Sequence, residues 1–82
     1  MPYTLQRLAS GSYDLVLDGE IVGSVTRDVT KGGEVRGWDA ELLDDARPFP
    51  PPFAEVAHRF ETFAAAASWL GDPTFVPDEA IL

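Results

Sequence analysis

Residues 13–25 read YDLVLDGEIVGSV, and this stretch decides the fold. Two apolar arms flank Asp18-Gly19, the dipeptide most typical of a tight two-residue turn between antiparallel strands. Strand alternation places Tyr13, Leu15 and Leu17 on one face of the first arm. In the returning arm it places Ile21 and Val25 on one face, and Gly23 indicates a bulge or a close backbone approach.

Three further segments have strand-like patterns. Tyr3 to Leu8 predicts a first strand, which ends in a cluster of turn-forming residues. Residues 35–43 alternate, with Trp38, Ala40 and Leu42 on one face and Gly37, Asp39 and Glu41 on the other. Residues 54–61 are open to two interpretations, an early start of the following helix or an edge strand. The alternation of Val56, His58 and Phe60 slightly favours the strand.

A helix is predicted close to the carboxyl end. Thr62 is a good N-terminal cap, and Gly71 is a good stop signal. Between them an apolar stripe recurs at helical spacing; its members are Phe63, Ala66, Ala67 and Leu70. The small alanines would let this helix lie close to a sheet.

These elements predict an α+β fold, a two-layer sandwich of a three- or four-stranded antiparallel sheet packed by one C-terminal helix. Residues 1–82 are expected to form a single domain. Within it, residues 44–54 form a proline-rich rigid crossover, extended over residues 48–53, with Phe49 and Phe53 anchored in the core. Residues 72–82 are expected to be an extended tail that packs only through Phe75 and Val76. The face without the helix is expected to stay open and to carry the function.

Composition restricts the classes of function. The chain of 82 residues has 14 acidic and 6 basic side chains, a net charge of −8, and no cysteine. The bases are scattered singly, whereas nucleic-acid binders normally concentrate them, so direct nucleic-acid binding is not expected. Disulfides and thiolate metal sites are excluded. No segment has the length of a signal peptide or a membrane span, which predicts a soluble, cytoplasmic protein with no membrane partner.

Phe60, Thr62, Ala66 and Trp69 follow the spacing F-x-T-x-x-x-A-x-x-W after several short strands. This pattern resembles the end of the arm-binding domains of phage integrases, β-β-β-α modules that lay a sheet on DNA. Those domains are basic and this chain is acidic, so the resemblance implies the fold only. As a type, the chain also resembles small acidic proteins of phages and mobile elements, including anti-CRISPR proteins and DNA mimics.

The chain shows no catalytic constellation. His58 is the only histidine, and a half-buried position beside the aromatics of the junction between sheet and helix is expected for it, not catalysis. Asp44-Asp45 lacks the alternating oxygen ligands of a calcium loop and is expected to be a solvated acidic turn. Pro48 and Pro51 have P-x-x-P spacing, but a rigid crossover is the preferred interpretation over docking to a partner. No enzyme activity, metal or cofactor is predicted.

The function predicted from these observations is non-enzymatic binding of a basic protein partner; one version is an inhibitor or decoy that occupies the partner's nucleic-acid-binding surface. The acids expected to contribute are Asp14, Asp18, Glu20, Asp39, Glu41, Asp44 and Asp45. One alternative is a nucleic-acid-binding module that uses Arg7, Arg27 and Arg36 on the open face of the sheet. Others are an accessory domain with no activity of its own and, least favoured, a small enzyme. The sequence makes no prediction of oligomeric state.

Overall fold

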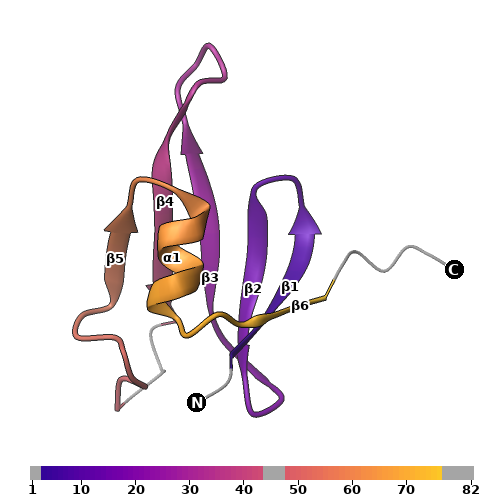
Figure 1. The fold of residues 1–82 in the computed structure, drawn as a ribbon, viewed down its shortest axis with the longest axis vertical. Coiled ribbons are helices and arrows are strands. Elements are labelled where there is room, and N and C mark those ends of the chain that lie inside the picture. The colour runs from indigo at the N-terminus through magenta and orange to yellow at the C-terminus, as the bar shows by residue number, and fades with distance from the viewer. Residues whose placement is uncertain (1–2, 44–47, 77–82) are drawn as a thin grey trace, which may run out of the picture.

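A six-stranded mixed sheet carries one helix on one of its faces (Figure 1). The computed structural model describes residues 3–43 and 48–76. The elements are β1 (Tyr3–Ala9), β2 (Ser12–Leu17), β3 (Glu20–Val29), β4 (Val35–Leu42), β5 (Ala57–Phe60), α1 (Phe63–Trp69) and β6 (Thr74–Val76). The strand order is β5-β4-β3-β2-β1-β6. The α+β class is confirmed, whereas the prediction of three or four antiparallel strands is wrong.

The turn between β2 and β3 forms as the sequence predicts. Asp18 and Gly19 both have positive φ, 52° and 81°, in the two-residue loop between Leu17 and Glu20, which pair with each other. Two central residues with positive φ give the turn a backbone twist that matches the twist of the strands. Glycine adopts this conformation without strain, and aspartate tolerates it better than most residues.

A bulge in β3 changes the predicted side-chain pattern of the hairpin. Leu15 pairs with Gly23 but Val16 pairs with Ile21, so Val22 is the extra residue. The expected face of Ile21 is therefore wrong: its side chain is 53% exposed, and Val22 packs against the core instead. An extra residue interrupts the two-residue alternation, and the assignment of Ile21 and Val25 to one face does not include this interruption.

Gly23 also lies where another backbone comes very close. A Cβ atom at this position would collide with the carbonyl oxygen of Glu41 on β4. Both expectations for Gly23, a neighbouring bulge and a close backbone approach, are confirmed.

The edge-strand interpretation of residues 54–61 is correct over Ala57–Phe60, which pairs antiparallel with β4. The helix then begins and ends where the sequence predicts. The Thr62 hydroxyl accepts a hydrogen bond from the Ala65 backbone N–H at 3.0 Å, and Gly71 has a φ of 88° just beyond the C-terminal cap. Ala66 is buried against the sheet.

The proline-rich segment anchors in the core but is not extended throughout. Phe53 is buried and Phe49 packs against the core, as expected. However, the Phe53 N–H donates to the Pro50 carbonyl at 2.9 Å, and the Pro51-Pro52 bond is cis. This hydrogen bond closes a four-residue turn with a cis-proline in its third position, so the extended prediction is wrong over residues 50–53. Residues 44–47 of the predicted crossover lie outside the described residues.

The beginning of the predicted tail forms a strand of the sheet. Thr74–Val76 runs parallel to β1, with Leu5 opposite Phe75, and the preceding Pro73 is buried. The segment therefore packs through more than Phe75 and Val76. A parallel partner so distant in sequence leaves no local signal, which explains why the sequence reading did not add this strand. Residues 77–82 lie outside the described residues.

The core lies between the sheet and the layer formed by α1 and the proline-rich segment. It is made of Tyr3, Leu5, Leu15, Val25, Ala40, Leu42, Phe53 and Leu70. The side chains that β1 to β4 contribute to this core follow the alternation of their strands, so one face of the sheet is apolar.

In the part of the chain that the structure describes, no helix is long and apolar enough to cross a membrane.

We expect Gly23→Ala to destabilise the fold by about 3 kcal/mol, because the added methyl group meets backbone, which cannot move aside as a side chain can. Urea denaturation followed by tryptophan fluorescence measures this loss. Gly32→Ala is the matched control, since a Cβ there would lie 3.8 Å from the nearest atom, the Thr30 hydroxyl oxygen. Equal stability of the two variants would contradict the close approach.

Tyr3 makes the fold sensitive to alkaline pH. Burial raises the pKa of its phenol above the ordinary 10.0, and the hydroxyl donates to the Pro51 carbonyl at 2.7 Å. The folded state therefore favours the protonated phenol, and this contribution to stability is present below pH 10 and is lost as the pH rises through the raised pKa.

Tyr3→Phe is expected to cost about 1 kcal/mol at pH 7 through the lost hydrogen bond. The difference in free energy of unfolding between the native protein and Tyr3→Phe should shrink above pH 10, because only the native protein then has this phenol to ionise. Urea denaturation at pH 7, 9 and 10.5 measures the difference, and a constant value over this range would refute the role of the phenol.

Candidate functional site

Three of the predicted acids come together on the sheet face that the helix leaves open. Asp14 pairs with Ser24, and Ser24 pairs with Glu41, so these residues form one row across β2, β3 and β4. Directly opposite residues project to the same side of a sheet, and two strand spacings separate Asp14 from Glu41 by about 10 Å. Asp39 lies two residues before Glu41 on the same face. We call these residues, Asp14, Ser24, Asp39 and Glu41, the acidic row.

Arg59 partly neutralises one end of this face. Its guanidinium group donates to Asp28 at 2.9 Å and to Asp39 at 3.2 Å. The hydrogen bonds to Asp28 and then to Asp39 raise the pKa of Arg59 above its ordinary value. Asp14 and Glu41, in contrast, form no ion pair within residues 3–43 and 48–76. The negative charge available to a partner is therefore centred on Asp14 and Glu41.

The remaining predicted acids are not part of the acidic row. Asp18 and Glu20 are exposed at the β2–β3 turn. Asp18 lies four residues along the chain from Asp14, a separation of about 13 Å in extended chain. Asp44 and Asp45 lie outside the described residues.

The alternative of an arginine patch on the open face is wrong. Arg7 pairs with Tyr13, and Arg27 pairs with Trp38. Both aromatic rings contact Phe63 of the helix, so both arginines project to the helix side. Arg36 belongs to a bulge near the tip of the β3–β4 hairpin, because Gly37 pairs with Asp28 while Val35 pairs with Val29.

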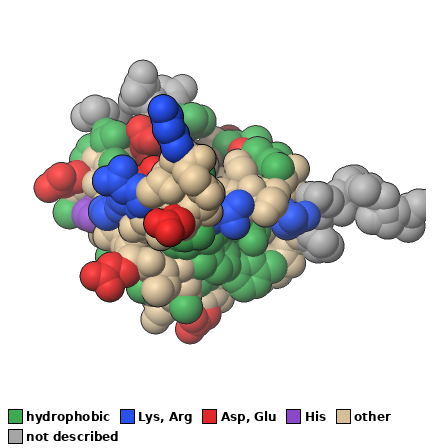
Figure 2. Space-filling view, turned by 90° about the horizontal axis from the view of Figure 1, so that it is seen from above, with side chains coloured by type: hydrophobic (Ala, Val, Ile, Leu, Met, Phe, Trp, Pro, Cys, Tyr) green, Lys and Arg blue, Asp and Glu red, His purple; other side chains and the backbone are tan. Residues whose placement is uncertain are grey.

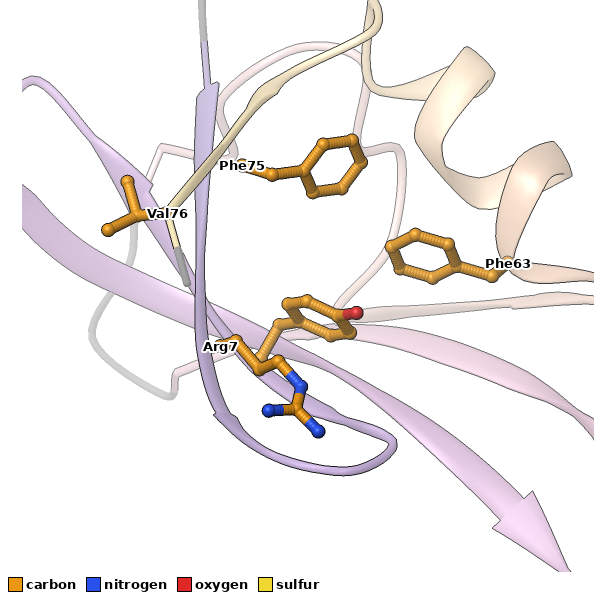
Figure 3. Close-up of a pocket in the computed structure, with 5 residues that line it drawn as sticks. Arg7, Phe63, Phe75 and Val76 are labelled. Atoms are coloured by element: carbon orange, nitrogen blue, oxygen red, sulfur yellow. The ribbon is translucent and has the colours of Figure 1, made fainter. Parts of the chain in front are cut away.

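The helix side of the sheet has a hollow of about 350 Å³ beside α1 (Figure 3). We call it the aromatic hollow; its lining residues are Arg7, Tyr13, Phe63, Phe75 and Val76. The Tyr13 and Phe63 rings are stacked with centroids 5.0 Å apart, and Phe75 lies 5.6 Å from Phe63. Figure 2 shows hydrophobic side chains gathered on this side, in the lower half of the view, with both basic and acidic side chains around them.

The hollow exists because the helix is short and lies towards one side of the sheet. Its seven residues contact β4 and β5, which leaves part of β1 and β2 without a helical cover (Figure 1). Strand β6 then brings Phe75 beside Tyr13, at a centroid distance of 6.4 Å. The sequence reading missed this site because it did not pair β6 with β1. One signal was present: alternation from Tyr3 and Leu5 already assigns Arg7 to the apolar side.

His58 occupies the position expected from the sequence and has a structural role. Its ring lies 4.7 Å from Trp69 and 5.7 Å from Phe53, centroid to centroid. The Nε2 atom accepts hydrogen bonds from the backbone N–H groups of Ala54 at 3.1 Å and Glu55 at 3.2 Å. This nitrogen therefore holds the chain as it enters β5. Among the described residues, no group of three or more histidine or acidic side chains could hold a metal ion.

Comparison with protein families, with curated proteins and with solved structures finds no match to this chain.

Replacing His58 with phenylalanine keeps a ring against Trp69 and removes the acceptor for both backbone N–H groups. We expect a loss of about 1 to 2 kcal/mol in the free energy of unfolding. Hydrogen exchange of the Ala54 and Glu55 amides, measured by NMR, should accelerate in this variant. Unchanged exchange at both amides would show that Nε2 does not hold this turn.

Proposed function

We propose that this protein is a non-enzymatic binding protein that docks the open face of its sheet on a basic surface of another protein. The observation that carries the proposal is the acidic row. Asp14 and Glu41 stand on one row with only Ser24 between them, on a face that the helix does not cover. Two carboxylates about 10 Å apart, neither in an ion pair with another described residue, suit two separate cationic side chains of a partner.

The charge of the open face favours a basic partner. Among the described residues, strand register places Asp14, Asp28, Asp39 and Glu41 on it with Arg59 as the single base. The net charge of −8 adds a long-range field of the same sign. Opposite charge on the partner would speed association and make the affinity fall with salt.

The side chains between the acids suit a protein partner. Ser12 pairs with Thr26, and Thr26 pairs with Asp39 of the acidic row, so two short hydroxyl groups lie next to the acids on this face. Short hydroxyl side chains project only a little above the sheet, and each of them can donate or accept a hydrogen bond. Such a surface can approach a partner closely, with the carboxylates fixing its orientation.

Surfaces that bind nucleic acid are strongly basic, because they must neutralise phosphates. We therefore retain the decoy version of the proposal, in which the acidic row occupies such a surface. The opposite alternative, in which this protein itself binds nucleic acid through the open face, receives no support, because Arg7 and Arg27 project to the other side.

The experiment is affinity capture from host lysate with the tagged protein at about 50 mM and about 500 mM salt, with partners identified by mass spectrometry. Two double variants are compared with the native protein. Asp14→Asn with Glu41→Gln removes two charges from the acidic row. Glu55→Gln with Glu61→Gln removes two charges from exposed positions elsewhere and is the matched control.

We expect a basic protein to be captured at low salt and released at high salt. The acidic-row variant should lower its recovery by about tenfold, which corresponds to about 1.4 kcal/mol of binding free energy, while the control variant retains it. Equal recovery with both variants, or capture that is indifferent to salt, would refute docking through the acidic row.

A further inference from the structure

Two apolar side chains lie together on the open face of the sheet, close to the acidic row. Val16 follows the fully buried Leu15 on β2, so strand alternation turns its side chain to the open face. Ile21 pairs with Val16, projects to the same side and is 53% exposed. This part of the open face is therefore apolar and accessible.

Leu43 extends this apolar group to the next strand position. It is 48% exposed and follows Leu42, whose side chain is in the core, so it alternates to the open face. Its N–H donates to the Val22 carbonyl at 2.9 Å, which places it beside the end of β3 that carries Ile21. We call Val16, Ile21 and Leu43 the apolar row. Exposed apolar side chains that are grouped, unlike single ones, are typical of binding surfaces.

The apolar row runs beside the acidic row. Val16 lies two residues beyond Asp14 along β2, and Leu43 lies two residues beyond Glu41 at the end of β4. Two residues of extended chain span about 7 Å, so each of these carboxylates has an apolar side chain as its neighbour along the strand. A partner that covers the apolar row therefore meets both acids along one side.

We propose that the partner segment that docks on this face is a basic amphipathic helix, with apolar side chains on the apolar row and cations on the acidic row. The inference rests on the proposed function, because it names the element of the basic partner that docks there. Both rows cross the strands, so the outer members of a row are two strand spacings, about 10 Å, apart. Seven residues of a helix rise about 10.5 Å, so helical positions i and i+7 match the two ends of a row.

An extended segment matches these rows less well than a helix. Side chains on one face of an extended chain repeat about every 7 Å, a spacing that does not fit two groups about 10 Å apart. An extended chain laid flat on the side chains of a sheet would also cover backbone N–H and C=O groups without giving them partners. A helix makes these hydrogen bonds internally.

Charge complementarity selects a basic helix. Asp14 and Glu41 form no ion pair within residues 3–43 and 48–76, and the whole chain carries a net charge of −8. Two lysines or arginines seven residues apart, beside the apolar stripe of the helix, would place one cation near each carboxylate. An acidic helix would bring like charges together, which is unfavourable.

NMR titration of the ¹⁵N-labelled full chain with synthetic peptides tests the proposal. The probe is a peptide of alanine and glutamine with blocked ends and about 18 residues, long enough to form a helix in water. It carries leucine at positions i, i+4 and i+7 and lysine at i+1 and i+8. We expect saturable shifts of the Ile21, Ser24 and Glu41 amides. The same peptide with a central proline should bind at least about tenfold more weakly, because proline breaks the helix.

Variants of the protein separate the apolar contact from the charges. Ile21→Thr keeps a β-branched side chain but removes apolar surface, so it should lower the peptide affinity about fivefold at low and at high salt. Val29→Thr, at a 44% exposed position on the same strand, is the matched control and should leave the affinity unchanged. Asp14→Asn with Glu41→Gln should lower the affinity about fivefold at about 50 mM salt and remove most of its salt dependence.

If Ile21→Thr fails to give a folded spectrum, Ile21→Val replaces it, with a loss of about twofold expected. No saturable shift below about 2 mM peptide, equal binding of the proline peptide, or unchanged affinity of the Ile21 variant would each overturn the helix. These results leave the proposed function standing when lysate capture still depends on salt and on Asp14 and Glu41. Capture that depends on neither would overturn the proposed function whatever the peptide does, so the two failures are distinguishable.

Discussion

Ring-on-ring packing between the helix and the sheet is the contact on which the rest of this structure depends. Seven residues of α1 are too few for a helix to persist alone in water. Phe63 anchors the first turn against Tyr13 and Trp38, with ring centroids 5.0 and 4.8 Å away. Trp69 anchors the last turn against rings from β5 and from the proline-rich segment, with Phe60 at 5.0 Å and Phe53 at 4.9 Å. Contacts with the sheet therefore fix the position of the helix. The aromatic hollow begins where this layer of aromatic rings ends.

Local signals predicted most of the fold, because the features concerned are local in origin. The Asp18-Gly19 turn, the Thr62 cap and the β5 strand each depend on a few neighbouring residues. The side-chain direction of Ile21 at the bulge and the turn at 50–53 depend on how the chain meets distant backbone, and alternation or proline content alone predicted them wrongly. The pairing of β6 with β1 joins segments about 70 residues apart and leaves no trace in either segment. For the candidate sites, strand alternation correctly assigned Asp14, Asp39 and Glu41 to the polar side of their strands. It could not predict the aromatic hollow, because the hollow forms only where β6 pairs with β1.

The two sides of the sheet differ in chemistry, and the alternation of each strand is the cause. On β2, Asp14 faces out between Tyr13 and Leu15, which face the helix. On β4, Asp39 and Glu41 alternate with Trp38, Ala40 and Leu42 in the same way. The arginines Arg7 and Arg27 follow the apolar set, so the strands separate negative from positive charge across the thickness of one sheet. The net charge of −8 is consequently a poor guide to what each surface attracts.

The order of the strands also bears on self-association. Both edges of the sheet, as far as the structure describes it, are its shortest strands, β5 with four residues and β6 with three, while the ten-residue β3 lies inside. An unpaired edge is a template on which another chain can add a strand, and a short edge offers few backbone groups for it. On β5 the exposed Arg59 places a charge at the rim, and the buried Pro73 precedes β6 without a backbone N–H. The short, charged or proline-flanked edge strands thus disfavour fibril growth by strand addition, even though Ile21, Val29 and Val35 are exposed on longer strands or at their ends.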